Sequence, residues 1–380
     1  MNKLLMVTTV PVVLTNFLLP FAAHFRKRGW QVDAMSCGFS PNDICHQYFD
    51  RLWEVQWSRN PLDPRNLLGT PGKIREIISH ERYDIVHVHT PVAAFVTRYA
   101  LKDLRKQLGT SVIYTAHGFH FLPGANPLKN AAFVALEKLA SDWTDWLVTI
   151  NHEDEAAVER YQLVSPGHSA YMPGIGVDLD YYNPQLVAAS AVSQLRVELG
   201  IGAKTPLLLS VAEFTPRKRH QDSIAAIAKL NRPDVHLAIA GSGPLLERMQ
   251  QLAIDLGVGD RIHFLGRRND IPVLMTAASA NILVSAQEGL PRSVMESLAL
   301  NLPTIGTKIR GTQDLLAGGY GLLIDVGDVA GLTAAIAWIL DRPEEAKNMA
   351  ERGREHLSTY DLKCIIKLHE ELYADAIALD

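Results

Sequence analysis

Short apolar runs alternate with amphipathic stretches along the first half of the chain. The apolar runs predict five strands, at Leu4–Thr8, Gln31–Ser36, Asp84–His89, Ser111–Thr115 and Trp146–Ile150. Between them, Pro71–His80 and Ala94–Leu108 have the apolar spacing of helices. Nearly continuous apolar strands that alternate with helices are typical of a parallel sheet covered on both faces.

The same pattern starts again in the second half. It predicts strands at Leu207–Val211, His236–Ala240, Arg261–Phe264, Asn281–Val284 and Pro303–Gly306. It predicts helices at Asp222–Leu230, Pro244–Leu256 and Pro291–Leu300. Two successive doubly wound, Rossmann-like α/β domains are the simplest account, because 380 residues exceed the usual size of a single core.

The join between the domains is expected in the turn-rich segment Pro173–Pro184. We therefore predict a first domain over 1–178 and a second over 179–360. The C-terminal segment 361–380 contains an amphipathic helix that is expected to pack back on the first domain. Ligands of open parallel sheets bind beyond the carboxyl ends of the strands, so two such domains are expected to enclose a cleft.

Composition and charge exclude several classes of protein. Hydrophobic residues make up 47% and charged residues 21%, as in ordinary globular proteins, and a net charge of -4 shows no nucleic-acid footprint. The three cysteines are too few and too scattered for a disulfide framework or a zinc site, which favours a reducing cytoplasm.

The sequence leaves contact with a membrane open. The apolar N-terminus is interrupted by Pro11, Asn16 and Pro20, so it predicts a first strand and helix and not a signal peptide or span. A cytoplasmic protein is expected, with the inner face of the membrane as the alternative location. A basic cluster has two interpretations, contact with anionic lipid headgroups or a solvated helix face, and the second is favoured. Its members are Arg98, Lys102, Arg105 and Lys106.

The most informative stretch is EGLPRSVME, at Glu288–Glu296, directly after a predicted strand. Pro291 suits the first position of a helix, whose free N–H groups and positive dipole end suit a diphosphate. Two carboxylates beside such a site can accept hydrogen bonds from two polyols, a donor sugar and a ribose. The competing interpretation is a capped surface helix with incidental glutamates.

This stretch, continued as SLALNLPTI, resembles the paired-glutamate motif of glycosyltransferase family 4. That family has the GT-B fold and retains the anomeric configuration. The resemblance runs through nearly the whole chain, and is most like the branch that builds capsular polysaccharides, exopolysaccharides and other cell-envelope glycans. The motifs that carry it are His89–Pro91, Thr115–Phe121, Pro173–Asp178, Gly241–Pro244, Phe264–Gly266 and Ile309–Gly311.

The resemblance implies roles for the residues of this motif. Glu288 would hold hydroxyls of the donor sugar, and Glu296 would hold the ribose. The backbone of Gly289, Leu290 and Pro291 would lie close to the sugar and phosphates. Arg292 and Ser293, in the first turn of the helix, belong to the same donor-binding set.

His117 follows the apolar strand SVIYTA and precedes Gly118, which permits a sharp turn at a strand end. A lone histidine is usually structural, but this position favours a site. By resemblance, His117 lies at the donor sugar near the anomeric carbon, where it orients the sugar and is not a nucleophile. For His120, a plain loop side chain is an equally good interpretation.

The resemblance also implies an arginine and a lysine against the pyrophosphate, in the loop after Leu207–Val211. Lys218 matches the lysine, but the arginine position holds Glu213. Arg217 and Arg219 are both open as the second cation. The competing interpretation of this cluster is a solvated basic loop.

Three glycines, Gly241, Gly243 and Gly266, are expected with Arg267 to line the nucleotide pocket. Alone, the GSGP stretch is equally typical of a tight turn. No metal or other cofactor is expected. Asp178–Leu179–Asp180 falls in the linker, and the pair His87 and His89, which shares one face of a strand, lacks further zinc ligands. No G-x-G-x-x-G follows the first strand, which argues against a dinucleotide oxidoreductase.

The sequence thus predicts a metal-independent, retaining hexosyltransferase of polysaccharide biosynthesis. The expected partners are a UDP-sugar donor, UDP-glucose before others, and a glycan or lipid-linked glycan acceptor, with no nucleic acid. Two alternatives stay open: a nucleotide-sugar epimerase of the same architecture, and a non-catalytic nucleotide-sugar-binding protein.

Overall fold

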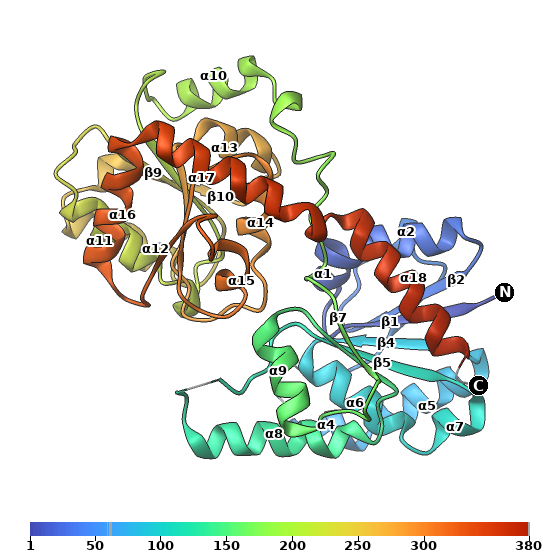
Figure 1. Cartoon of the computed structure of the whole chain (residues 1–380). Coiled ribbons are helices and arrows are strands. Elements are labelled where there is room, and N and C mark those ends of the chain that lie inside the picture. The colour runs from blue at the N-terminus through green and yellow to red at the C-terminus, as the bar shows by residue number, and fades with distance from the viewer. Residues whose placement is uncertain (59, 61–62, 123, 379–380) are drawn as a thin grey trace. The chain divides into compact units, whose positions relative to one another are not determined.

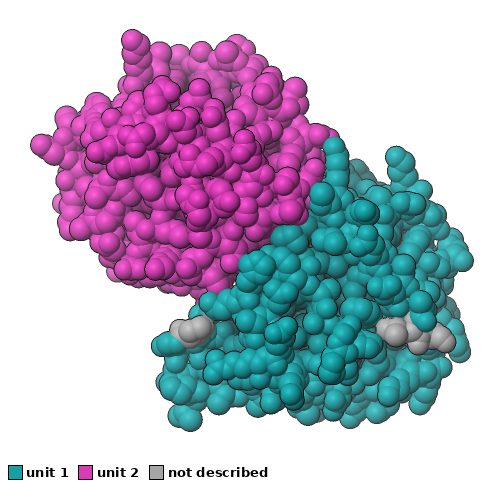
Figure 2. Space-filling view, viewed as in Figure 1, with its two compact units in different colours: residues 1–175, 363–380 teal, residues 176–362 magenta. Residues whose placement is uncertain are grey.

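The computed structural model describes residues 1–58, 60, 63–122 and 124–378, and the chain folds as two compact units (Figures 1 and 2). Unit 1 comprises Met1–Ile175 and Lys363–Asp380, and unit 2 comprises Gly176–Leu362. The division falls at Ile175, slightly before the expected boundary at 178. The described part of the C-terminal segment belongs to unit 1.

Unit 1 is built on a seven-stranded parallel sheet in the order β3-β2-β1-β4-β5-β6-β7. The five predicted strands are confirmed to within two residues at either end. The short strands β3 and β7 were not predicted. The bounds are β1 Lys3–Val7, β2 Gln31–Ser36, β3 Leu52–Glu54, β4 Ile85–His89, β5 Ser111–Ala116, β6 Trp146–Thr149 and β7 Ser169–Tyr171.

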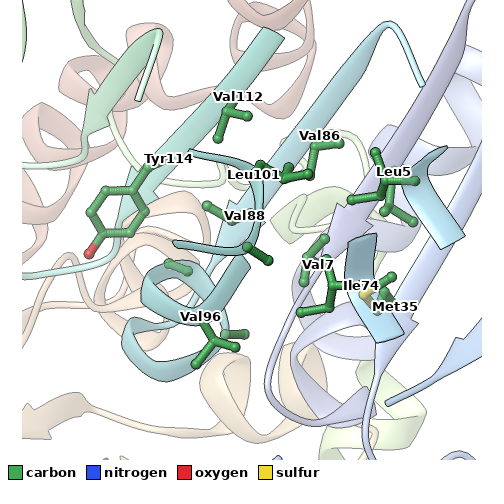
Figure 3. Close-up of a cluster of buried hydrophobic side chains, with 14 of the residues drawn as sticks. Leu5, Val7, Met35, Ile74, Val86, Val88, Val96, Leu101, Val112 and Tyr114 are labelled. Atoms are coloured by element: carbon green, nitrogen blue, oxygen red, sulfur yellow. The ribbon is translucent and has the colours of Figure 1, made fainter. Parts of the chain in front are cut away.

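Helices pack against this sheet around a buried apolar core. In that core, β-strand residues such as Leu5, Val86 and Val112 contact Ile74 and Val96 from two helices (Figure 3). The helices are α1 Pro11–Val13, a π-helix η1 Leu14–Leu18, α2 Leu19–Lys27, α3 Cys45–Tyr48, α4 Arg65–Leu68, α5 Thr70–Glu81, α6 Pro91–Leu101, α7 Leu104–Leu108, α8 Pro127–Ser141, α9 His152–Tyr161 and α18 Leu362–Ala378.

Unit 2 has a six-stranded parallel sheet in the order β10-β9-β8-β11-β12-β13, with a core on each face. Its strands are β8 Leu207–Val211, β9 His236–Ala240, β10 Ile262–Gly266, β11 Ala280–Leu283, β12 Thr304–Thr307 and β13 Leu322–Ile324. Its helices are η2 Pro184–Leu186, α10 Ala189–Glu198, η3 Pro216–Lys218, α11 His220–Lys229, α12 Leu246–Asp255, η4 Gly259–Arg261, α13 Ile271–Ala277, α14 Arg292–Ala299, α15 Thr312–Leu316, α16 Val329–Asp341, α17 Pro343–His356 and η5 Leu357–Tyr360.

The strand order of each sheet reverses once. In unit 1 the reversal lies between β1 and β4, and in unit 2 it lies between β8 and β11. At such a point the loops that leave the two strands diverge, and ligands of open α/β sheets bind there. The loop after β11 carries Glu288 and the loop after β8 carries Lys218. Because β8 and β11 are the two strands at the reversal, the topology brings these two side chains to it.

The favoured interpretation of the basic cluster was wrong for its two arginines, whereas Lys106 is exposed as expected. The segment Ala94–Leu108 forms two helices, α6 and α7, instead of one. Arg98 is only 2% exposed, pairs with Glu137 at 3.0 Å and lies 4.1 Å from the ring centre of Tyr114. Arg105 is buried too and pairs with Asp145. Both guanidinium groups tie elements of unit 1 together and form no solvated or lipid-facing patch.

Throughout the described ranges, no helix has both the length and the apolar character needed to cross a membrane.

Candidate active site

The loop between β11 and α14 is built to present backbone N–H groups. Pro291 has an extended backbone (φ -76°, ψ 113°) and caps α14, which begins at Arg292. The prediction that Pro291 is the first helical residue is therefore one residue early, although its carbonyl already accepts from the amides of Val294 and Met295. The amides of Gly289 and Ser293 donate to no acceptor in the described part of the chain.

Glu288 lies buried at the start of this loop, 7% exposed, between two cations. Its carboxylate accepts from Lys218 Nζ at 2.6 Å and from Arg217 Nη1 at 3.0 Å. Burial by itself would raise the pKa of Glu288, but the charges of Lys218 and Arg217 outweigh burial and lower that pKa below its ordinary value. The carboxylate is therefore ionised at neutral pH.

The next strand loop holds the Glu288 loop in place. Arg310 Nε donates to the carbonyl of Glu288 at 3.1 Å. Gly311 has φ 70°, and a Cβ at this position would lie 1.9 Å from the carbonyl oxygen of Gly289. Only glycine fits here, because both the conformation and the space exclude a side chain. The IRG motif thus buttresses the loop; sequence reasoning quoted the motif but gave Arg310 no role.

The structure separates the two arginines that the sequence left open. Arg217 reaches Glu288 and the carbonyl of Gln287, whereas Arg219 pairs with Asp222 of α11 at 2.6 Å. The side chain of Glu213, at the position where the family has arginine, is exposed. Of the two arginines, Arg217 is therefore the one that lies with Lys218 at Glu288.

Glu296, the second carboxylate of the motif, lies one turn into α14 in a different setting. It accepts from the hydroxyl of Tyr182 at 2.6 Å and lies 2.7 Å from Arg292 Nε. Burial raises the pKa of Glu296, and Arg292 and Tyr182 offset that rise only in part. Tyr182 was not predicted, since nothing in local spacing links a linker tyrosine to a helix more than a hundred residues away.

The sequence Asp178–Leu179–Asp180 has a structural role in the linker. Asp178 Oδ1 accepts from the amides of Asp180 and Tyr181, each at 3.0 Å. This is an aspartate turn of the kind that holds a loop. It directs the chain toward Tyr182.

The glycines expected at the nucleotide pocket lie together at the ends of β9 and β10. Gly241 donates to the carbonyl of Gly266 at 2.8 Å, and Arg267 Nε donates to Ser242 Oγ at 3.1 Å. A Cβ on Gly241 would lie 2.0 Å from the carbonyl oxygen of Ala212, and one on Gly243 would also clash with backbone of the β8 loop. The GSGP turn is thus packed against the loop that leads to Lys218.

In unit 1, His117 follows β5, and Gly118 turns the chain with φ 112°. His117 Nε2 shares a hydrogen bond with His89 Nδ1 at 3.1 Å. Burial and the neighbouring His369 lower the pKa of His117 to about 4, so the ring is neutral at physiological pH. The structural interpretation and the site interpretation of His117 both accord with this position. His120 is exposed.

His117 belongs to a larger histidine cluster. The rings of His87 and His89 lie 4.2 Å apart, on one face of β4 as their spacing predicted. His87 bonds Thr115 of β5 and Tyr373 of α18, each at 2.7 Å. Burial lowers the pKa values of His87, His89 and His369 well below the ordinary range. His89 and His369 also line, with His117, a cavity of about 10 Å³. Sequence reasoning missed His369 and Tyr373, which reach the cluster only because the chain returns to unit 1.

The adjoining HTP loop is strained. Thr90 has φ 66°, which is unfavourable for a β-branched residue. Its hydroxyl binds both the amide of Thr9 at 3.0 Å and the Thr9 hydroxyl at 2.8 Å, and these bonds hold the conformation. Strain of this kind is concentrated at functional sites.

Among the residues that the structure describes, no group of three or more histidine, cysteine, aspartate or glutamate side chains is arranged to hold a metal ion.

Two Rossmann-like units with parallel sheets, each with polar groups gathered at the carboxyl ends of its strands, define a GT-B architecture. The solved structure of Anabaena Alr3699/HepE in complex with UDP has the same fold, with a TM-score of 0.81 at 20% identity over 99% of this chain and 100% of that chain.

Sequence comparison places the chain within that architecture. Residues 14–181 match the model described as Glycosyltransferase Family 4, and residues 192–356 match Glycosyl transferases group 1. EpsD of Bacillus subtilis (strain 168), whose name assigns it to the glycosyltransferases, is 32% identical over 100% of this chain and 98% of EpsD. UDP-Gal:alpha-D-GlcNAc-diphosphoundecaprenol alpha-1,3-galactosyltransferase of Escherichia coli is 26% identical over 70% of this chain and 68% of that protein. The chain belongs to glycosyltransferase family 4.

Proposed function

We propose that this glycosyltransferase moves a hexose from a UDP-sugar to a glycan or lipid-linked glycan in polysaccharide biosynthesis, with retention of the anomeric configuration. The observation that carries the proposal is the buried, ionised Glu288 between Lys218 and Arg217, directly before the N-terminus of α14. An acceptor of sugar hydroxyls and a cluster of cations for a diphosphate stand there side by side.

UDP-glucose is the donor that we propose first. HepE has been solved with UDP-glucose, and the name of the Escherichia coli relative gives a UDP-sugar donor and a lipid-linked acceptor. The residues around the nucleotide do not by themselves select the base, so the donor rests on these similarities.

The proposed mechanism uses charges that the chain already holds. Lys218 and Arg217 together carry two positive charges against the single negative charge of Glu288. The net positive charge and the N–H groups before α14 would stabilise a diphosphate as it leaves. With the donor bound, Glu288 would accept hydrogen bonds from sugar hydroxyls while it keeps both cations in place. The neutral His117 would orient the sugar.

We propose front-face substitution as the route to retention because Glu288 is a weak nucleophile in this setting. A double displacement needs a carboxylate nucleophile under the anomeric carbon. Two cations lower the basicity of Glu288, which also lowers its nucleophilicity. No carboxylate in the described part of the loop Thr115–Phe121 is present to act as the base that inversion needs. We therefore propose front-face substitution, in which the departing diphosphate takes the proton of the acceptor hydroxyl as the new C–O bond forms on the same face.

The experiment is donor turnover followed by product NMR. The purified protein would be incubated with UDP-glucose, UDP-N-acetylglucosamine or GDP-mannose, with and without a lipid-linked glycan fraction. Release of UDP that rises with acceptor, and an alpha anomeric coupling in the product, are expected. Conversion of the donor to its epimer without acceptor would favour an epimerase instead. Donor binding without UDP release would favour a non-catalytic binding protein, and a beta linkage would refute retention.

A further inference from the structure

Tyr182 lies in the turn-rich segment that opens unit 2, and its backbone is held on both sides. Its amide donates to the carbonyl of Asp178 at 2.8 Å, and its carbonyl accepts from Arg354 Nη1 at 3.4 Å. Earlier in the same segment, the amide of Val177 donates to the carbonyl of Tyr360 at 2.9 Å. The side chain of Tyr182 is only 5% exposed. A fixed backbone and a buried ring therefore give the Tyr182 hydroxyl a defined position.

The hydroxyl of Tyr182 donates a hydrogen bond to the second glutamate of the motif. It lies 2.6 Å from Glu296 Oε1. Burial and the negative charge of Glu296 raise the pKa of Tyr182, so the phenol keeps its proton at neutral pH. An ionised carboxylate can only accept, so the direction of this hydrogen bond runs from the tyrosine to the glutamate.

Both partners of Glu296 meet it at the same oxygen. Arg292 Nε lies 2.7 Å from Oε1, the atom that Tyr182 also contacts. Among the residues that the structure describes, none donates a hydrogen bond to Oε2. An ionised carboxylate has about four acceptor positions on its two oxygens. Tyr182 and Arg292 therefore fix one oxygen of Glu296 and leave the other able to accept from a ligand.

Of these two partners, Tyr182 is the more rigid. The side chain of Arg292 is 39% exposed, so water screens its charge and competes for its donors. Glutamate is among the side chains that lose most rotamer freedom when they are ordered. A carboxylate that is already ordered in the folded protein binds a hydroxyl with less loss of entropy than a mobile one. The buried tyrosine therefore prepares Glu296 for its ligand.

We propose that Tyr182 is a positioning residue for nucleotide recognition: its hydroxyl holds Oε1 of Glu296 so that Oε2 accepts from a ribose hydroxyl of the donor. Tyr182 acts through Glu296 and makes no contact with the donor itself. The inference rests on the proposed function, which supplies the nucleotide donor. It adds a specificity to that function, because a site arranged in this way distinguishes a ribose from a sugar without these hydroxyls.

The test compares two ligands that differ only at the ribose. UDP and 2′,3′-dideoxy-UDP would be titrated by calorimetry into the full chain, as wild type and as Tyr182→Phe. The wild type should bind UDP about 10- to 100-fold more tightly, as expected for a hydrogen bond to a charged acceptor. In Tyr182→Phe this ratio should fall by about three- to tenfold, through weaker binding of UDP alone. A merely structural effect would weaken both ligands alike and would leave the ratio unchanged.

Matched variants separate the Tyr182 hydroxyl from general effects of the substitution. Tyr181→Phe removes one hydroxyl from the neighbouring tyrosine, which is 55% exposed, and it should leave both affinities as in the wild type. In a Glu296→Ala background, Tyr182→Phe should change the ratio no further, because both residues act on the ribose through one contact. Calorimetric unfolding of the same samples would verify that each variant is folded.

The proposal is overturned if Tyr182→Phe keeps the wild-type ratio. A higher ratio in that variant overturns it too, since the hydroxyl would then compete with the ribose for Glu296. Equal binding of the two ligands by the wild type would likewise overturn it, because Glu296 would then meet no ribose hydroxyl. Tighter binding of GDP than of UDP would refute the proposed donor instead. The same variants titrated with GDP and its dideoxy analogue would then test Tyr182, since both nucleotides carry the same ribose.

Discussion

Substitution of Lys218 by methionine should destabilise the protein, because the buried negative charge of Glu288 then loses one of its two cationic partners. Arg217 would be the one cation left beside Glu288, and its side chain is 44% exposed and therefore well screened by water. Methionine fills a similar volume to lysine, so packing changes little. The effect should therefore report the electrostatics of the pair.

The magnitude can be bounded from the burial of the two partners. Removing one partner of a fully buried pair costs about 3–5 kcal/mol. Lys218 is 12% exposed and Arg217 remains, so about 1–3 kcal/mol is expected here. For a unit of this size, that is a fall in Tm of roughly 3–10 °C at pH 7. The pH dependence of the free energy of unfolding follows from the lowered pKa of Glu288. The carboxylate stabilises the folded protein at pH values above its pKa in the unfolded chain, and this contribution is lost as pH falls through its pKa in the folded protein. The penalty in the variant should therefore shrink toward pH 4.

The assay is calorimetric unfolding of the wild type, Lys218→Met, Glu288→Gln and the double variant, without nucleotide. The double variant should recover much of the loss, because it leaves no buried charge without its partner. Lys204→Met, at an exposed lysine of the same unit, serves as the control. The electrostatic reasoning is refuted if Lys218→Met unfolds with the wild type, or if the double variant loses the full sum of the single losses.

Three further predictions test the site. Glu288→Ala should lose far more turnover than UDP affinity, whereas Glu296→Ala should weaken UDP itself; calorimetric titration that ranks them the other way would reverse the two roles. In His369→Leu, the free energy of unfolding should fall less as the solution is acidified. In the wild type the pKa of His369 is lowered to about 4, so the unfolded chain takes up the proton first and the free energy of unfolding falls between about pH 6.5 and 4. That histidine accounts for about 3 kcal/mol over this range, and denaturant unfolding at pH 7 and pH 5 would show whether the variant loses less. Turnover should persist in EDTA, since the proposed site relies on Lys218 and backbone N–H groups; activity restored only by added magnesium or manganese would contradict it.

The sequence predicted the central strands of both sheets because each lies in a short, mostly apolar run between helical or turn-rich stretches. It missed β3, β7 and β13, which have three residues each and lie at sheet edges, where burial is partial and the run is short. The same limit applies to Arg98, which looks like a solvated helix residue. Its ion pair with Glu137 depends on how α8 packs on α6, and helical spacing alone does not contain that information.

The part of the candidate site that lies within one sequence motif, Glu288–Glu296, could be predicted. The strand, glycine and proline around Glu288 indicated the loop and the helix N-terminus after it, and the family resemblance indicated Lys218. The partners that complete the site come from elsewhere in the chain. Tyr182 arrives from the linker, and Tyr373 arrives from the last helix. Neither contact has a local signal, because each is made only when a distant segment folds against the sheet.

The two glutamates of the motif stand in contrasting electrostatic settings, and this contrast indicates where the diphosphate of a donor would lie. Around Glu288, two cations and one carboxylate leave a net positive charge close to the N-terminus of α14. Around Glu296, one cation balances one carboxylate, and a tyrosine hydroxyl donates to it. An anionic diphosphate is therefore attracted to the Glu288 end, and a neutral polyol such as ribose meets no competing net charge at Glu296. In a UDP-sugar the diphosphate joins the sugar to the ribose, so a diphosphate held by this charge and by the N-terminus of α14 would leave the sugar and the ribose free to reach the two glutamates on either side of it.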